Sequence, residues 1–141
     1  MDLKLTASPD GGDIEIVNGQ ITLDEGPETA IYLSLFGGNH DDSGDESDDA
    51  KQWWGNLATD VDAEKYRSRT QQVLRGLPAT SANLVVVRNA ATADLEWMRG
   101  VVFDEIAATA SIPARDTVRL SIVGTVDGET TQYFFDREWN R

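Results

Sequence analysis

The sequence predicts an α+β fold with an N-terminal β-hairpin, three helices and a C-terminal three-stranded antiparallel meander, in which helices pack on one sheet. Two of the observations that predict this fold are hairpin signals: alternating apolar and polar residues flank Asn18-Gly19 near the start and Asp127-Gly128 near the end. A third is the helical spacing of apolar residues in three segments between them. With 141 residues, 40% of them hydrophobic, the chain fits one domain, residues 1–141.

The first hairpin is expected over residues 13–17 and 20–23, because both segments alternate and Asn18-Gly19 joins them. Residues 3–6 can form a short strand before it, and Ser8 to Gly12 is typical of a turn. Asp10 to Asp13 resembles the start of a calcium loop, but no glutamate stands at the twelfth position. A plain turn is therefore favoured there.

Two helices are predicted in the first half of the chain. Residues 28–36 place Ile31 and Leu35 at i, i+4 spacing, and Gly37-Gly38 stops the helix. A second helix is expected from about Ala63 to Arg75, with Asp62 as its cap and with Gly76 and Pro78 ending it.

A third helix is expected to start with Thr80 or Ser81 as its cap and to end near Gly100. Its apolar residues keep helical spacing as far as Val102, with a possible break at residues 89–92. The run from Leu84 to Val87 alone could be a buried strand, but residues 90–98 favour a helix over most of the segment.

Three strands are predicted after this helix. Residues 105–112 alternate loosely, residues 117–126 alternate well, and residues 130–135 follow the turn signal Asp127-Gly128. The second and third form a hairpin, and the first pairs with the second across residues 113–116. Trp139, just beyond the meander, can either close over the sheet or project towards a partner.

The charge is strongly negative, with 12 Lys plus Arg against 25 Asp plus Glu, or -13. Such a surface repels nucleic acid and anionic membranes, so neither is expected as a partner. No apolar run approaches a membrane span and the start lacks a secretion signal, so a soluble protein made inside the cell is expected. There is no cysteine, which excludes disulfides and thiolate chemistry.

Six of the acids lie between Asp41 and Asp49, in a stretch without apolar residues before Ala50, which predicts a mobile acidic loop at about 39–50. Carboxylates can collect Ca²⁺ or Mg²⁺, but a solvated loop is the favoured interpretation, and no metal or other cofactor is predicted. His40 is the only histidine, so neither a zinc cluster nor a Ser-His-Asp triad is expected.

Two tryptophans and a glycine, Trp53-Trp54-Gly55, follow the acidic run. Adjacent indoles cannot share one face of a strand or helix, so one is expected in the core and the other over a neighbouring element or partner. Further along, the predicted second helix carries four cations. They form either a solvated face paired with nearby acids of the same chain, which is favoured, or a basic ridge that docks an acidic partner or a neighbouring copy. These cations are Lys65, Arg67, Arg69 and Arg75.

The order of these features resembles the baseplate wedge family of Mu-like contractile-tailed bacteriophages. The resemblance covers nearly the whole chain, and Trp53-Trp54-Gly55 is its most specific element. The chain departs from the family pattern at Gln52, where a glycine is usual, and at Asn56, where an acid is usual.

The resemblance implies a structural protein related to the sheath-priming wedge component of T4-like baseplates, assembled in the host cytoplasm into the virion tail. Its implied partners are other wedge subunits and tail sheath or tube proteins, with a homo-oligomer possible in the assembly. The residues themselves favour strand addition at an exposed edge, either the N-terminal hairpin or residues 130–135. The expected interface residues are Trp53, Trp54, Gly55, Arg67, Arg69, Thr131, Tyr133 and Trp139.

Two other classes stay open. A glycoside hydrolase would need two carboxylates, such as Asp104 with Glu105 or Glu96, but adjacent strand residues face opposite ways, and no catalytic residue is predicted. An acidic protein-binding module, or an inhibitor that mimics a polyanion, is the other alternative, and salt-dependent binding to a basic partner by a monomer would favour it.

Overall fold

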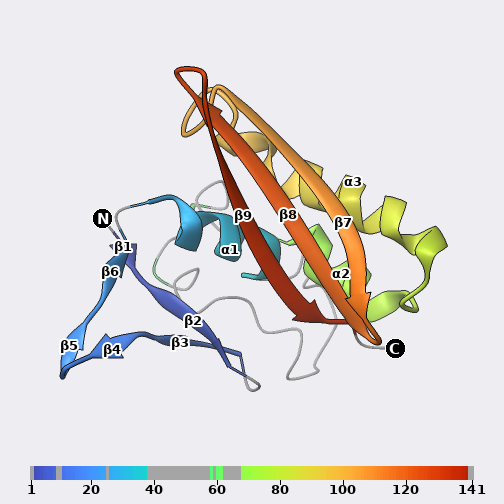
Figure 1. Ribbon diagram of the computed structural model, residues 1–141, viewed down its shortest axis with the longest axis horizontal. Coiled ribbons are helices and arrows are strands. Elements are labelled where there is room, and N and C mark those ends of the chain that lie inside the picture. Colours follow the sequence, from blue (N-terminus) through green and yellow to red (C-terminus); the bar gives the residue numbers. More distant parts are fainter. Residues whose placement is uncertain are drawn as a thin grey trace.

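A computed structural model describes residues 2–8, 11–24, 26–37, 58, 60–61 and 68–139. The fold is α+β, as the sequence predicted, with a three-stranded antiparallel sheet in the order β7-β8-β9 and helices on one face of it (Figure 1). The long strands are β7 (Glu105–Ala114), β8 (Thr117–Val126) and β9 (Glu129–Glu138). The helices are α1 (Glu28–Phe36), α2 (Arg69–Gly76) and α3 (Leu84–Leu95), with short 3₁₀ turns η4 (Ser81–Asn83) and η5 (Glu96–Met98) on either side of α3.

Six short strands at the N-terminus form three antiparallel pairs. These strands are β1 (Asp2–Leu3), β2 (Leu5–Ser8), β3 (Gly11–Ile14), β4 (Ile16–Val17), β5 (Gln20–Ile21) and β6 (Leu23–Asp24). β1 pairs with β6, β2 with β3, and β4 with β5. The β4-β5 turn has the predicted Asn18-Gly19, both at positive φ (52° and 76°), as a type I′ turn requires.

The three pairs meet at a ring of backbone hydrogen bonds. Lys4 N–H donates to Thr22 O (3.0 Å), Thr22 N–H to Glu15 O (2.9 Å), and Glu15 N–H to Lys4 O (3.0 Å). The chain changes its pairing partner at this ring. The three strand pairs β1-β6, β2-β3 and β4-β5 therefore extend from it as three arms in different directions (Figure 1). The turn predicted over Ser8 to Gly12 was too wide, because Ser8 pairs with Gly11 and Ala7 with Gly12 in the antiparallel β2-β3 ladder.

α1 has the predicted bounds and buries Ile31 and Leu35 completely. It is tied to the N-terminal strands, because Thr29 Oγ1 donates to Leu3 O at 2.9 Å.

The predicted start of α2 is wrong. A continuous helix over residues 63–75 is incompatible with Ser68, whose backbone is extended (φ -110°, ψ 109°). Ser68 is buried, and its hydroxyl donates to Ser34 O on α1 at 2.9 Å. A long-range contact therefore fixes the chain just before Arg69, while Gly76 and Pro78 mark the end as expected.

The first turn of α2 is capped by a carboxylate from α3. Asp94 accepts hydrogen bonds from the backbone N–H groups of Arg69 (2.9 Å) and Thr70 (2.8 Å) and from Thr70 Oγ1 (2.7 Å). Helix N-terminal N–H groups have no partner within their own helix, so this contact satisfies two of them and joins α2 to α3. Burial raises the pKa of Asp94, while the hydrogen bonds from Thr70 and Arg69 oppose that rise.

Replacing Asp94 by Asn should lower the free energy of unfolding by about 2 kcal/mol, because an amide group presents one acceptor where two are needed. Urea unfolding measures this loss, and Glu96→Gln, at an exposed carboxylate, is the matched control. Since the folded pKa of Asp94 is raised, the folded state holds this proton more tightly than the unfolded state. Its contribution to stability is full at low pH and is lost as pH rises through the folded pKa. The advantage of the wild type over Asp94→Asn should thus grow on acidification, and an advantage that shrinks would contradict this account.

α3 is a helix rather than a strand over Leu84–Leu95, as predicted, and it runs without the break considered at residues 89–92. It ends earlier than expected. After η5, Gly100 has positive φ (74°) and Phe103 N–H donates to Met98 O at 3.1 Å, so Val102 lies in a turn. The reversal returns the chain towards β7.

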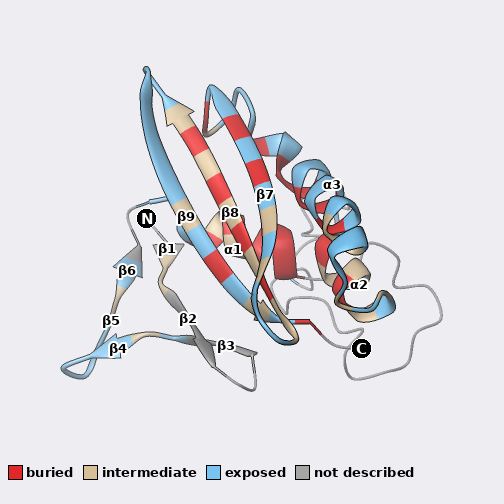
Figure 2. Cartoon of the chain, turned by 45° about the vertical axis from the view of Figure 1, so that its right-hand side comes forward, coloured by how far each residue is buried: buried red, intermediate tan, exposed pale blue. Residues whose placement is uncertain are grey.

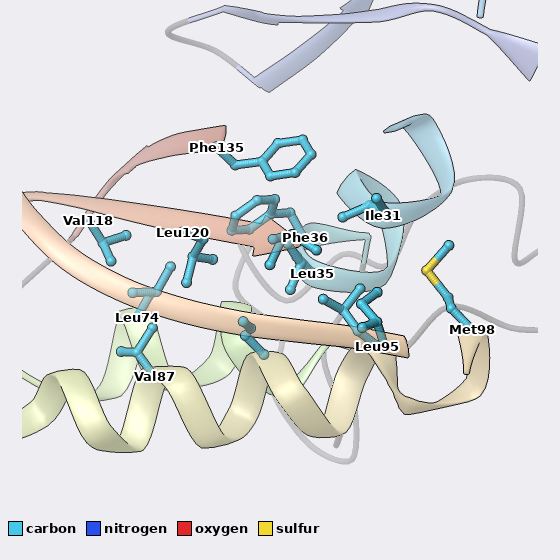
Figure 3. Close-up of a cluster of buried hydrophobic side chains, with 14 of the residues drawn as sticks. Ile31, Leu35, Phe36, Leu74, Val87, Leu95, Met98, Val118, Leu120 and Phe135 are labelled. Carbon is cyan, nitrogen blue, oxygen red and sulfur yellow. The ribbon is translucent and has the colours of Figure 1, made fainter. Parts of the chain in front are cut away.

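The core lies between the sheet and the helices (Figure 2). Along β8, residues of one face are fully buried while their neighbours are partly exposed, which is the alternation the sequence predicted. Figure 3 shows side chains from α1, α3 and the sheet in this cluster. The buried residues that form its centre are Ile31, Leu35, Val87, Ala91, Leu95, Val118, Leu120 and Ile122.

The meander has the predicted turns. Asp127 and Gly128 have φ values of 50° and 80° between β8 and β9, and Arg115-Asp116 turns the chain between β7 and β8. The β7-β8 register shifts between Ser111 and Ala114, around Pro113, which has no N–H to donate to a ladder.

Trp139 takes the first of its two predicted positions and closes over the core. Its side chain is fully buried, and its indole Nε1 donates to Leu77 O at 2.7 Å. Its backbone N–H donates to Asp116 O at 2.7 Å, which fixes the end of β9 beside the β7-β8 turn. A ring so placed cannot contact a partner, so Trp139 leaves the set of interface residues.

Candidate protein interface

β9 is an edge strand. Within the described part of the chain, β8 is the only strand that pairs with it. In Figure 1 its first half extends, with the β8-β9 turn, beyond the helices that cover the rest of the sheet. An open edge carries backbone donors and acceptors that another strand can use.

The register identifies which backbone groups face this open edge. In a hairpin closed by a two-residue turn, the pair next to the turn is hydrogen-bonded and alternate pairs follow the same pattern. For β8 and β9 these are the pairs 126–129, 124–131 and 122–133. The N–H and C=O groups of Thr130, Gln132 and Phe134 therefore point away from β8, towards the free edge.

The side chains of these three residues lie on the sheet face away from the helices, where Phe134 is 58% exposed. On the same face Arg119 makes two hydrogen bonds to Asp136, at 2.7 and 2.9 Å, across β8 and β9. This contact lowers the pKa of Asp136 and fixes the second half of β9 to its neighbour. A large exposed ring beside an ordered strand edge is typical of a protein interface.

On the opposite face of β9, Thr131 and Tyr133 line a cavity of about 460 Å³. The sheet packs there on Phe103, whose ring lies edge-on to that of Tyr133 with a centroid distance of 6.3 Å. Gly124 on β8 permits this approach, because a Cβ atom there would lie 2.3 Å from Phe103 Cε1. The residues that line the cavity are Pro27, Val102, Phe103, Gly124, Val126, Asp127, Glu129, Thr131 and Tyr133.

The β4-β5 hairpin presents a second apolar surface. Ile16 and Ile21 are cross-strand partners that are 64% and 54% exposed, Val17 is about half exposed, and so is Leu23 on the adjoining β6. The described side chains of this hairpin are largely exposed on both of its faces. A two-stranded ribbon is only marginally stable alone, so these aliphatic groups favour a covering partner.

The structure therefore brings together only some of the predicted interface residues. Thr131 and Tyr133 share one face of β9, while Arg69 opens α2 and lines neither the cavity nor the strand edge. Four others lie outside the described residues, namely Trp53, Trp54, Gly55 and Arg67. So do His40 and the acidic run of residues 41–49.

Sequence reasoning missed Phe134, Phe103 and Gly124 as parts of this site. A glycine in the middle of an alternating strand is a signal for close approach of another group, and Gly124 carried that signal. Nothing in the sequence indicated that Phe103 would be the group.

The carboxylates weighed for a hydrolase have other contacts. Arg99 Nε lies 3.1 Å from Glu96 Oε1, and Arg99 also contacts the carboxylate of Glu105. These two acids raise the pKa of Arg99. Asp104 Oδ2 accepts a hydrogen bond from the backbone N–H of Asp127 at 2.9 Å, at the β8-β9 turn.

No three His, Asp or Glu side chains are grouped for metal binding in the ranges that the structure describes. In the same ranges, no helix is long and apolar enough to cross a bilayer. No protein-family model, curated protein or solved structure matches this chain.

Proposed function

We propose that the protein is a structural subunit of a phage-type contractile-tail baseplate, which binds neighbouring wedge subunits, and the first sheath ring, by accepting their strands at the open edge of β9. The proposal combines the resemblance in the order of sequence features with the geometry of that edge. The proposed place of the protein is the tail baseplate of the virion.

The observation that carries the proposal is the row of outward backbone groups at Thr130, Gln132 and Phe134. They can give a continuous set of hydrogen bonds to an added strand. Phe134 on one face and the cavity beside Thr131 and Tyr133 on the other offer side-chain contacts on both sides of such a strand.

The apolar β4-β5 hairpin and the net charge of -13 also support an assembly role. Exposed aliphatic residues need a covering surface, and an acidic subunit selects neighbours with basic faces and repels other copies of itself. A homo-oligomer is therefore less favoured than a heteromer.

Replacing Gln132 by Pro tests the strand-addition mechanism. Its N–H faces away from β8, so proline should leave the meander folded while it removes a donor from the open edge. Binding to neighbouring tail proteins should weaken by more than about tenfold, since a lost backbone hydrogen bond and a clash with the incoming strand together exceed about 1.4 kcal/mol. Co-expression with those proteins, followed by size exclusion and mass measurement, gives the readout.

Two control variants make this experiment decisive. Gln132→Thr changes the side chain but keeps the N–H and should bind normally. Tyr133→Pro removes a donor that faces β8 and should unfold the sheet. A folded Gln132→Pro variant that still forms the heteromer would refute strand addition at β9. Failure of the wild type to form any heteromer, together with hydrolysis of peptidoglycan, would overturn the structural role itself.

A second candidate function is an acidic module that binds one basic partner outside any tail. The observation that favours it is the acidic rim of the cavity, where Asp127 and Glu129 join apolar walls. Such a module would be monomeric with a strongly salt-dependent affinity, whereas a baseplate subunit should remain assembled at high salt through its apolar contacts.

A further inference from the structure

The cavity beside β9 has a shape and charge that select one class of side chain. We propose that it receives a lysine or arginine side chain carried by the strand that adds to β9. This inference rests on the proposed strand addition and assigns the chemistry of the partner at one position.

Strand geometry directs an incoming side chain to the cavity. Side chains alternate between faces along a strand, and directly opposed residues of paired strands share a face. Residues of an added strand that lie opposite Thr131 and Tyr133 therefore point to the helix side of the sheet, the side on which the cavity lies. In strand addition, such pockets for alternate side chains provide specificity, while the backbone provides affinity.

The walls of the cavity suit a long aliphatic stem. Phe103 is buried, Tyr133 is half-buried, and Val102 and Val126 complete an apolar lining. Lysine and arginine place their methylene groups along such surfaces and keep the charged end near solvent. A cation over the rings of Tyr133 or Phe103 would gain a further attraction.

The charge of the lining is negative. Asp127 and Glu129 are the charged members, and none of the lining residues is basic. Neither of these carboxylates has a basic partner within the described ranges, and the carboxylate of Asp104 binds the backbone of Asp127. The nearby cation Arg99 is already paired with Glu96 and Glu105. The site therefore attracts a cation and rejects an acidic side chain.

A synthetic peptide can test this without knowledge of the natural partner. The probe is acetyl-Gly-Thr-Val-Thr-Lys-Thr-Val-Thr-Gly-amide, in which Lys and both Val residues share one face of the extended chain. Two further peptides carry norleucine or glutamate in place of the lysine. Titration against the full chain, followed by NMR shifts of the β9 amides, should show the lysine peptide binding about tenfold more tightly than the norleucine peptide, with the glutamate peptide weakest.

Variants then locate the preference. Asp127→Asn with Glu129→Gln should make the lysine and norleucine peptides bind equally, and asparagine tolerates the positive φ at position 127. The matched control, Asp60→Asn with Glu138→Gln, removes the same charge from exposed positions outside the cavity and should keep the preference.

The outcomes separate the two proposals. If all three peptides bind equally and Gln132→Pro abolishes their binding, strand addition stands and the basic-residue assignment is overturned. If the lysine preference persists in the variant with both Asp127→Asn and Glu129→Gln, the carboxylates of the cavity do not cause that preference. The basic-residue assignment is then overturned in this case too. Binding that Gln132→Pro leaves unchanged, or no binding by any peptide, would refute strand addition at β9 and the assignment with it.

Discussion

Replacing Trp139 by alanine should lower the free energy of unfolding by about 4 kcal/mol, as expected for truncation of a large, fully buried aromatic side chain. The side chain is fully buried although it lies near the end of the chain, so its removal leaves a large cavity under the sheet. It also leaves Leu77 O without the indole donor at 2.7 Å. Since the Trp139 backbone is bonded to Asp116, the β7-β8 turn should loosen as well.

Urea unfolding followed by far-ultraviolet circular dichroism measures this loss. Trp139→Phe keeps most of the apolar volume but not the hydrogen bond, so it should cost less than Trp139→Ala. Phe134→Ala, at an exposed ring on the other face of β9, should change stability by under about 1 kcal/mol. Equal stability of Trp139→Ala and wild type would show that the end of the chain does not belong to the core.

Replacing Gly124 by valine should cost about 3 kcal/mol, because the inner face of β8 has no room for a side chain at this position. Even a Cβ atom would lie 2.3 to 2.8 Å from three atoms of the Phe103 ring. That ring is buried and lies edge-on to the ring of Tyr133, and both rings line the cavity, so a shift of Phe103 that relieves the clash should disturb Tyr133 and the cavity lining. We therefore expect Gly124→Val to weaken peptide binding in addition to lowering stability.

A double-mutant cycle identifies the cause. Phe103→Leu alone should be destabilising, yet combined with Gly124→Val it should cost clearly less than the sum of both single changes, because the smaller side chain relieves the clash. Ser121→Val, on the opposite face of the same strand, should be nearly neutral. Additive costs for Gly124→Val and Phe103→Leu would mean that the clash is not the origin of the loss.

Local patterns were sufficient to predict most of the elements. The turns at Asn18-Gly19 and Asp127-Gly128, the bounds of α1 and the strand β8 follow from alternation, helical spacing and turn chemistry. These signals lie within a few residues of the structure that they specify. That is why they could be read without knowledge of the fold.

The errors arose where distant residues decide the local structure. The start of α2 depends on Ser68 bonding to α1 and on Asp94 capping the helix from α3. The early end of α3 depends on a turn stabilised by Phe103. No short window of sequence contains both partners of the α2 contacts, and at the end of α3 the local turn between Met98 and Phe103 interrupts an apolar spacing that continues to Val102, so periodicity extended both helices too far.

The candidate site could be predicted only in part for the same reason. Alternation places Thr131 and Tyr133 on one face of β9, but it does not indicate that Pro27 and Phe103 complete a cavity beside them. Either position of Trp139 was compatible with the sequence, because only the packed structure brings Leu77 O within reach of the indole. The role of Trp53-Trp54-Gly55 stays a prediction.

The ring at Lys4, Glu15 and Thr22 limits how the N-terminal region can change in evolution. Because each of these residues bonds to the other two, an inserted or deleted residue near the ring would displace all three arms at once. Additional residues at the Asn18-Gly19 tip would lengthen one arm and leave the others unaffected. The length of each arm can therefore vary at its tip, whereas the junction must keep a constant number of residues.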